Sequence, residues 1–190
     1  MIQDFTTLAV PQLIGETAAI VLDTQAAFGH LNAAQLNWKP AAESWSVAQC
    51  LDHLLTSNRQ MLPVMAAAAS GAHKASFWER MPILPGLMGK FMVRAVSPYA
   101  KQKVKAPAKI QPSTSALDAQ IVARFVDQQR EVAEHFKQLA AVQADRIVIT
   151  SPLLSVITYS LLDAARLTVA HERRHLAQAE RVMQTAGFPH

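Results

Sequence analysis

The stretch Ser160-Leu-Leu-Asp-Ala-Ala-Arg-Leu-Thr-Val-Ala-His-Glu-Arg-Arg-His175 lies near the end of a chain of 190 residues. Ser160, followed three residues later by Asp163, is a pattern typical of a helix N-terminus. Gly187 and Pro189 are signals that stop a helix. The sequence therefore predicts a long helix that begins near Ser160 and ends before Gly187.

His171 and His175 lie on one face of this predicted helix, about 40° apart around its axis and about 6 Å apart along it. Both imidazoles can therefore reach one metal ion, as in the H-E-x-x-H pattern of zinc sites. His175 falls inside the apolar stripe of the helix and His171 at its edge, so both need a partner, because unsatisfied burial is costly. From this face alone, metal ligation and a hydrogen-bonded polar cluster that includes Glu172 remain two open interpretations.

The positions after His175 do not supply the third ligand of a zinc protease. Gln178 and Arg181 stand where the long zinc-protease pattern needs Gly and His. Because a metal site usually needs at least three protein ligands, a further one must come from elsewhere in the chain. The candidates are His30, His53, His73, His135 and, at a terminus that we expect to fray, His190.

Four long segments show helical periodicity. Apolar residues make up 51% of the chain and glycine is sparse, which favours a mostly helical protein, and the length suits one domain over residues 1–190. The second segment opens with Ser46 and Gln49, a capping-box pattern, and contains Pro63, which we expect to bend it. The four segments run from about Pro11 to Leu31, from Ser46 to about Ser70, from near Ser115 to Leu139, and from near Ser160 to before Gly187.

The connection between the second and third segments is unusually long for one domain. It covers about 40 residues rich in Pro and Gly, and such connections are often functional covers. Leu84 to Val96 can form a short helix within it, and further on Arg146 to Thr150 can pair as a strand. The long connection predicts an all-α four-helix bundle with a crossover between helices two and three.

Several classes of protein are disfavoured by composition. No apolar run reaches the roughly 18 residues that cross a membrane, so we expect no membrane partner, and Met1-Ile-Gln-Asp4 does not begin a signal peptide. The single cysteine, Cys50, excludes an internal disulfide and is typical of a reducing cytoplasm. We expect Cys50 to be a buried core thiol.

The net charge of +4 raises nucleic acid as a partner. Basic residues gather between Lys101 and Lys109 and on the outer face of the last helix. No aromatic residues alternate with them to stack bases, which disfavours nucleic acid and favours a solvated surface. Arg94 and the Lys101–Lys109 cluster are nevertheless candidates to meet the carboxylates of a small anionic substrate.

Among the candidate third ligands, His53 has the most informative surroundings. It lies two turns inside the second predicted helix, after Trp45 and Ser46. A helical-wheel count places it roughly 120° from the centre of the apolar stripe, so the pattern alone predicts a flanking or exposed residue.

The order Trp45-Ser46, then His53, then His171, His175 and Gln178 in a last helix resembles the DinB/YfiT superfamily, which includes metal-dependent enzymes. The stretches 36–40 and 105–107 also look like it, and the resemblance spans about residues 31–183. It implies a four-helix bundle with one divalent ion bound by three histidines, one from helix two and two from helix four. Carried over to this chain, the ligands are His53, His171 and His175.

Relatives in that superfamily include transferases and isomerases that use low-molecular-weight thiols, and hydrolases. The resemblance implies a metal-dependent transferase or hydrolase acting on a small molecule, with zinc or nickel as the ion and such a thiol as cosubstrate. Our leading mechanism is a metal-bound thiolate that attacks an electrophile. Glu172 is the candidate catalytic proton acceptor, or alternatively a partner that steadies a histidine, and Gln178 is expected to support a ligand.

An alternative function stays open. The histidines can be structural in a non-catalytic metal-binding or stress-response module, because kinship in fold does not fix a reaction. The apolar, Trp-bearing connection is also compatible with a homodimer.

Overall fold

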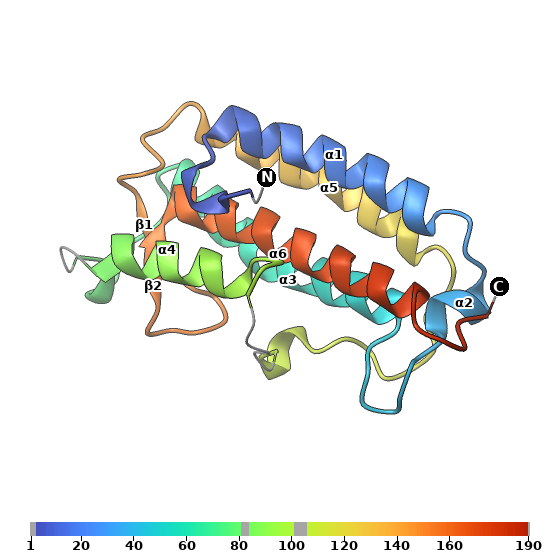
Figure 1. Cartoon of the computed structure of the whole chain (residues 1–190). Helices are drawn as coiled ribbons and strands as arrows, with labels where there is room; N and C mark the ends of the chain where they lie inside the picture. Colours follow the sequence, from blue (N-terminus) through green and yellow to red (C-terminus); the bar gives the residue numbers. More distant parts are fainter. Residues whose placement is uncertain (1–2, 81–83, 101–105, 190) are drawn as a thin grey trace.

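Four long helices lie along the length of the molecule in the computed structural model, which describes residues 3–80, 84–100 and 106–189 (Figure 1). They are α1 (Val10–Phe28), α3 (Val47–Ala69), α5 (Ile121–Leu139) and α6 (Leu161–Met183). The shorter elements are α2 (Ala33–Asn37), α4 (Leu84–Val96), the 3-10 turns η1 (Phe5–Thr7), η2 (Trp78–Arg80) and η3 (Ala108–Ile110), and the strands β1 (Val148–Thr150) and β2 (Thr158–Ser160). The all-α prediction is confirmed.

The predicted starts of α3 and α6 are confirmed by their caps. The Ser46 hydroxyl accepts a hydrogen bond from the Gln49 backbone N–H at 3.1 Å, and the Gln49 side-chain oxygen accepts one from the Ser46 N–H at 3.2 Å. The Ser160 hydroxyl accepts from the Asp163 N–H at 3.0 Å. These side chains satisfy backbone donors that have no partner inside the helix, which fixes where each helix begins.

The predicted start of the third long helix is wrong by six residues, because α5 begins at Ile121 and not near Ser115. The Asp118 side chain accepts from the Gln120 N–H at 2.9 Å, which holds a turn just before the helix. Leu117 donates its N–H to the Asn37 side chain at 2.8 Å, so this segment bonds to a distant part of the chain. A local pattern could not show that competing partner.

Hydrogen bonds between distant segments establish the direction of each long helix. Asn37, which precedes α3, exchanges hydrogen bonds with the backbone of Leu117, which precedes α5, so these two helices begin at the same end. Arg166 in α6 donates to the carbonyl of Leu8, just before α1, so α1 and α6 begin at the other end. The segment between α3 and α5 therefore runs back along the bundle (Figure 1), which confirms the predicted crossover.

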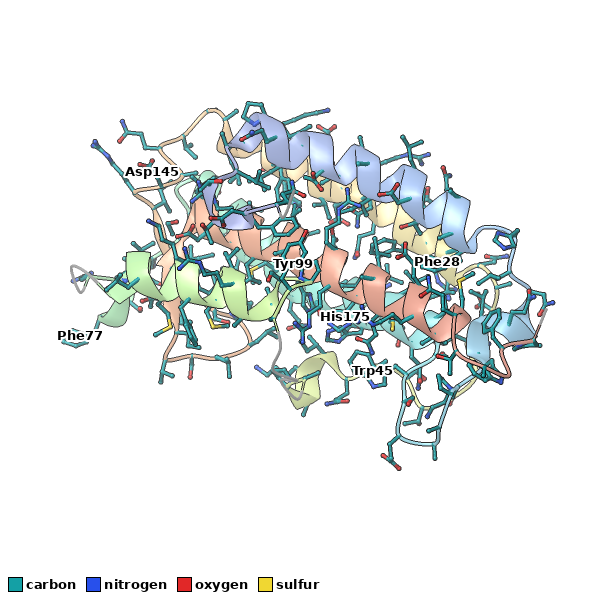
Figure 2. The ribbon with its side chains drawn as sticks, in the orientation of Figure 1. Phe28, Trp45, Phe77, Tyr99, Asp145 and His175 are labelled. Carbon is teal, nitrogen blue, oxygen red and sulfur yellow. The ribbon has the colours of Figure 1, made fainter. Side chains whose placement is uncertain are left out.

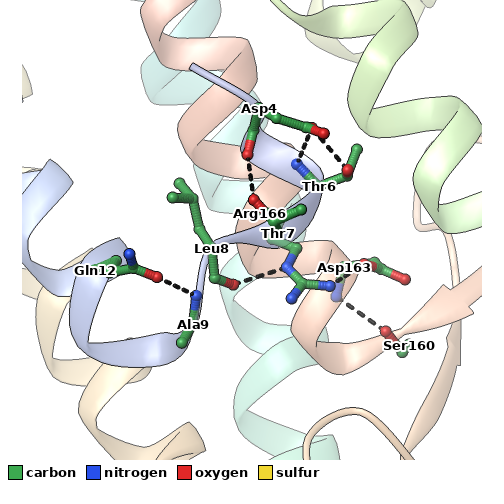
Figure 3. A network of polar contacts seen from close by, with 9 residues as sticks. All are labelled: Asp4, Thr6, Thr7, Leu8, Ala9, Gln12, Ser160, Asp163 and Arg166. Atoms are coloured by element: carbon green, nitrogen blue, oxygen red, sulfur yellow. Dashed lines mark hydrogen bonds and ion pairs between the residues drawn. The ribbon is translucent and has the colours of Figure 1, made fainter.

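α4 belongs to that crossover and packs on α6 through small residues. A Cβ on Gly89 would overlap the carboxylate of Asp163, so only glycine allows this close approach. The Asp163 carboxylate accepts from Arg166 at 2.9 Å, and Arg166 bonds Leu8 in turn (Figure 3). The first turn of α6 thus joins the N-terminal segment to the rest of the bundle.

The outer face of α6 is more covered than the sequence predicted. Arg173 donates to Glu16 at 2.8 Å and also pairs with Asp23, both on α1. Arg174 donates to the backbone carbonyl of Ser97 at 2.9 Å. The solvated basic surface expected for these arginines is therefore wrong, because α1 and the segment after α4 cover this side.

A small hairpin precedes α6. The predicted strand near residue 148 is confirmed as β1, which pairs antiparallel with β2 so that Ile149 lies opposite Tyr159. Both side chains are buried. Among the described helices, none combines the length and apolar character needed to cross a membrane.

Candidate metal centre

Three histidines converge between α3 and α6. His53 comes from α3 and His171 and His175 from α6, and each offers a ligand atom within 4.8 Å of the others. His53 Nε2 lies 3.1 Å from His171 Nε2. Figure 2 shows His175 beside Trp45 at this place. The spacing of four residues on α6 supplies two imidazoles on one face, and the adjacent antiparallel helix supplies the third.

The outer nitrogens of two imidazoles are held by hydrogen bonds. His53 Nδ1 lies 2.5 Å from the backbone carbonyl of Ile110, and a carbonyl can only accept, so Nδ1 carries the proton. His175 Nδ1 lies 3.0 Å from the side-chain oxygen of Gln178. In both rings the hydrogen bond at Nδ1 leaves Nε2 with a lone pair, so Nε2 is the ligand atom. A hydrogen bond of this kind usually supports a metal-binding histidine.

The distance between His53 and His171 fits a shared ion. Two imidazole nitrogens that each lie about 2.0–2.1 Å from zinc are about 3.0–3.4 Å apart at ligand angles near 95–110°. The 3.1 Å between the Nε2 atoms of His53 and His171 falls in that range. The same distance also suits an N–H···N hydrogen bond, which explains how the cluster stays satisfied when no ion is bound.

The electrostatic environment keeps these histidines neutral. Burial lowers the pKa of His53 and takes that of His171 well below its usual value. Burial also lowers the pKa of His175 to about 3, and the positive charge of Arg174 acts in the same direction. Because metals bind the neutral imidazole, little proton competition remains at neutral pH.

Trp45 covers the cluster from one side. Its ring stacks on His175 at a centroid distance of 5.5 Å and lies 4.9 Å from the ring of His53. The sequence singled out Trp45 but gave it no role at the site. The contribution of Ile110 is a backbone carbonyl, so no side-chain pattern could have revealed it.

The wheel-based prediction that His53 is flanking or exposed is wrong, since only 1% of its surface is accessible. Trp45 and the η3 turn, which ends at Ile110, cover the edge of α3 where His53 lies. Both come from outside the helix, so the burial is tertiary in origin. His171 is half-buried, and His175 is buried as its stripe position predicted.

The other candidate ligands lie apart from this cluster. His30 is exposed, His73 bonds the buried carboxylate of Glu79 at 2.9 Å, and His135 lies on α5. The terminal candidate, His190, is outside the described residues.

Cys50 and the basic residues of the crossover differ in exposure. Cys50 is fully buried, as predicted, and burial raises the pKa of its thiol to about 12, so it is not a ready nucleophile. Arg94 and Lys109 are exposed on the crossover, whereas residues 101–105 of the basic cluster lie outside the described residues.

Glu172 points into the bundle interior. One carboxylate oxygen accepts hydrogen bonds from the side-chain amides of Asn58 and Gln129, each at 2.8 Å. The other oxygen is buried with no partner among the described residues. Burial raises the pKa of Glu172 to about 7, although both amide donors act against this. Its role as a proton acceptor stays a prediction.

Comparison with known families agrees with this geometry. The model of the DinB superfamily matches residues 22–179. The chain belongs to the DinB superfamily. No curated protein and no solved structure matches it. In this DinB-superfamily chain the matched region contains all three histidines of the cluster.

Proposed function

We propose that this DinB-superfamily protein is a metal-dependent enzyme whose divalent ion, zinc or nickel, is held by His53, His171 and His175. The observation that carries the proposal is the convergence of three neutral imidazoles within 4.8 Å. Two of them have their outer nitrogens bonded, so their Nε2 atoms face the shared position. An all-nitrogen set of this kind suits zinc or nickel better than magnesium or calcium.

The proposed reaction is the transfer of a low-molecular-weight thiol to an electrophile, or a hydrolysis. When bound, the ion supplies Lewis acidity and lowers the pKa of a thiol or a water. In the transfer, the thiol gives up its proton, its sulfur forms a bond to carbon, and the leaving group departs with the electron pair. Trp45 keeps water away from one face of His175 and His53.

Glu172 is the candidate for holding the released proton. A carboxyl group with a pKa of about 7 can both accept and return a proton at neutral pH. Its bonds to Asn58 and Gln129 equally support a role in positioning α6, and through it His171. Glu172→Gln separates the two roles, because the amide preserves the shape but cannot take up a proton.

Elemental analysis of untagged protein tests the metal site. We expect about one divalent ion per chain in the wild type, lost in His53→Ala and in His171→Ala. His30→Ala is the matched control, because His30 is exposed and apart from the cluster. A wild type that holds no divalent ion after reconstitution would contradict the proposal.

A measurement of turnover distinguishes the proposed enzyme from the non-catalytic metal-binding module. The metal-loaded protein is screened for thiol transfer to small electrophiles and for ester and amide hydrolysis. We expect activity that disappears with the ion and in His175→Ala. A protein that gains stability from metal but turns over no substrate would favour the metal-binding module with structural histidines.

A further inference from the structure

α4 exposes large apolar side chains, unlike an ordinary amphipathic helix. Its inner stripe, which packs on the bundle, consists of Pro85, Gly89 and Val93, all buried. Its outer stripe carries Leu87 and Phe91, which are 69% and 65% exposed. A surface helix normally places its large apolar side chains against the core. Large apolar residues held outward by a small inner stripe indicate a partner for the outer face.

The outer stripe is also basic. Lys90 and Arg94 are exposed on the same side of α4 as the two apolar side chains, at helical spacings of three and four. The described residues between 70 and 117 include five Lys and Arg residues and one acid. That acid, Glu79, is buried and bonded to His73, and Asp4 of the N-terminal segment, which lies near Arg94, offsets one of the two cations of this stripe. The partner of this face should therefore be anionic.

Further apolar side chains are exposed at the same end of the molecule. Phe77, which precedes α4, is 72% exposed and projects from the outer edge in Figure 2. Val156 is 75% exposed on the loop between β1 and β2, and α4 packs against β2. Figure 1 shows this loop at the same end of the molecule as α4. The combination of protruding aromatic and aliphatic residues with Lys and Arg is typical of segments that lie in a lipid interface.

We propose that the outer face of α4 docks on an anionic lipid surface. This α4 face consists of Leu87, Lys90, Phe91 and Arg94. A second copy of the chain fits the face less well, because a two-fold contact would bring its cations against their own copies. Nucleic acid fits less well because Leu87 and Val156 do not stack on bases, whereas a lipid interface can bury them beside Phe91. The sequence predicted no membrane partner because no apolar run is long enough to cross a membrane. Docking on a lipid surface needs no such run.

Vesicle sedimentation tests the proposal with the full-length protein. Vesicles of phosphatidylcholine with roughly a third phosphatidylglycerol are compared with phosphatidylcholine alone. We expect binding to the anionic vesicles that weakens with salt. The double variant Leu87→Ser/Phe91→Ser and the charge variant Lys90→Glu/Arg94→Glu should each bind at least about tenfold more weakly. Leu22→Ser is the matched control, because Leu22 is 67% exposed on α1.

Three results would overturn the proposal. One is absence of binding to anionic vesicles, and another is equal binding by wild type and both variants. The third is a dimer in sedimentation velocity that dissociates in the double variant, which would assign the face to a second copy. Circular dichroism and metal content should match the wild type in every variant, because all the substituted side chains are exposed.

Discussion

Two polar clusters share α6 and arrange their hydrogen-bonding groups in opposite ways. The histidine cluster is His53, His171 and His175, and the carboxamide cluster is Glu172, Asn58 and Gln129. In the carboxamide cluster, two N–H donors converge on one carboxylate oxygen. In the histidine cluster, the bonded nitrogens of two rings face outward and their lone pairs face inward.

The difference suits the carboxamide cluster to holding helices together and the histidine cluster to binding a ligand. Donors that converge on an acceptor bond to it directly and hold the helices together. The second carboxylate oxygen of Glu172 has no partner among the described residues. Converging acceptors need a proton or a cation between them, because like partial charges repel. Two residues adjacent in the sequence, His171 and Glu172, therefore lie in clusters with different hydrogen-bonding patterns. Substitutions in the histidine cluster should change metal affinity, and substitutions in the carboxamide cluster should change the stability of the metal-free protein.

The largest expected effect is on metal affinity in His175→Ala. Loss of one of three ligands should weaken zinc binding by more than about 100-fold. This loss should exceed the effect of removing a residue that only hydrogen-bonds a ligand. Competition with a coloured chelator measures this affinity. Glu172→Gln is the matched control and should stay within about tenfold of the wild type. Equal losses in the two variants would mean that the clusters are not separate.

The second effect is on the stability of the metal-free protein in Glu172→Ala. The variant leaves the amides of Asn58 and Gln129 without their acceptor and opens a cavity, so the free energy of unfolding should fall by about 3 kcal/mol. Urea unfolding in the presence of a chelator measures it. Glu172→Gln keeps an acceptor and should cost less than about 1 kcal/mol. A stable Glu172→Ala variant would refute the structural role of this cluster.

A smaller effect on metal affinity is expected in Gln178→Ala. The Gln178 side chain holds the Nδ1 of His175, so its loss should weaken metal binding by about 10-fold to 100-fold. Gln178→Glu restores an acceptor and should recover most of the affinity. Affinity that is unchanged in Gln178→Ala would show that this contact does not orient the ring.

The smallest effect is a pH dependence of the metal-free protein. Burial lowers the pKa of His175 to about 3, against about 6.5 in an unfolded chain, so below pH 6.5 the unfolded state binds more protons. The contribution of His175 to the free energy of unfolding should therefore be largest above about pH 6.5 and fall as the pH drops toward 3. His175→Ala should show a weaker fall between pH 7 and pH 5 in urea titrations. The same slope in both proteins would contradict the prediction.

Glu172 changes the stability with pH in the direction opposite to His175, so it provides an internal check. Its pKa is raised to about 7 from the usual 4.5, so the folded state binds more protons between those values. Its contribution to stability is therefore present below about pH 4.5 and is lost as the pH rises through 7. Glu172→Gln should remove this loss.

Local chemistry in the sequence predicted part of the fold and the site. The caps at Ser46 and Ser160 fixed the starts of α3 and α6, because a cap involves only residues three apart. The same spacing between Ser115 and Asp118 was misleading, because Asn37, from a distant part of the chain, binds Leu117. The pair His171 and His175 was visible as helical spacing, and the resemblance to the DinB/YfiT superfamily supplied His53.

The sequence by itself determined a helical protein with a crossover, two of the cluster histidines on one helix face, and a buried Cys50. Only the tertiary structure decided that His53 is buried, because Trp45 and the carbonyl of Ile110 come from outside its helix. Only the tertiary structure decided that α4 turns its large side chains outward, because the fit of Gly89 against Asp163 sets the rotation of that helix. Periodicity describes one helix at a time, whereas burial depends on what the rest of the chain brings to it.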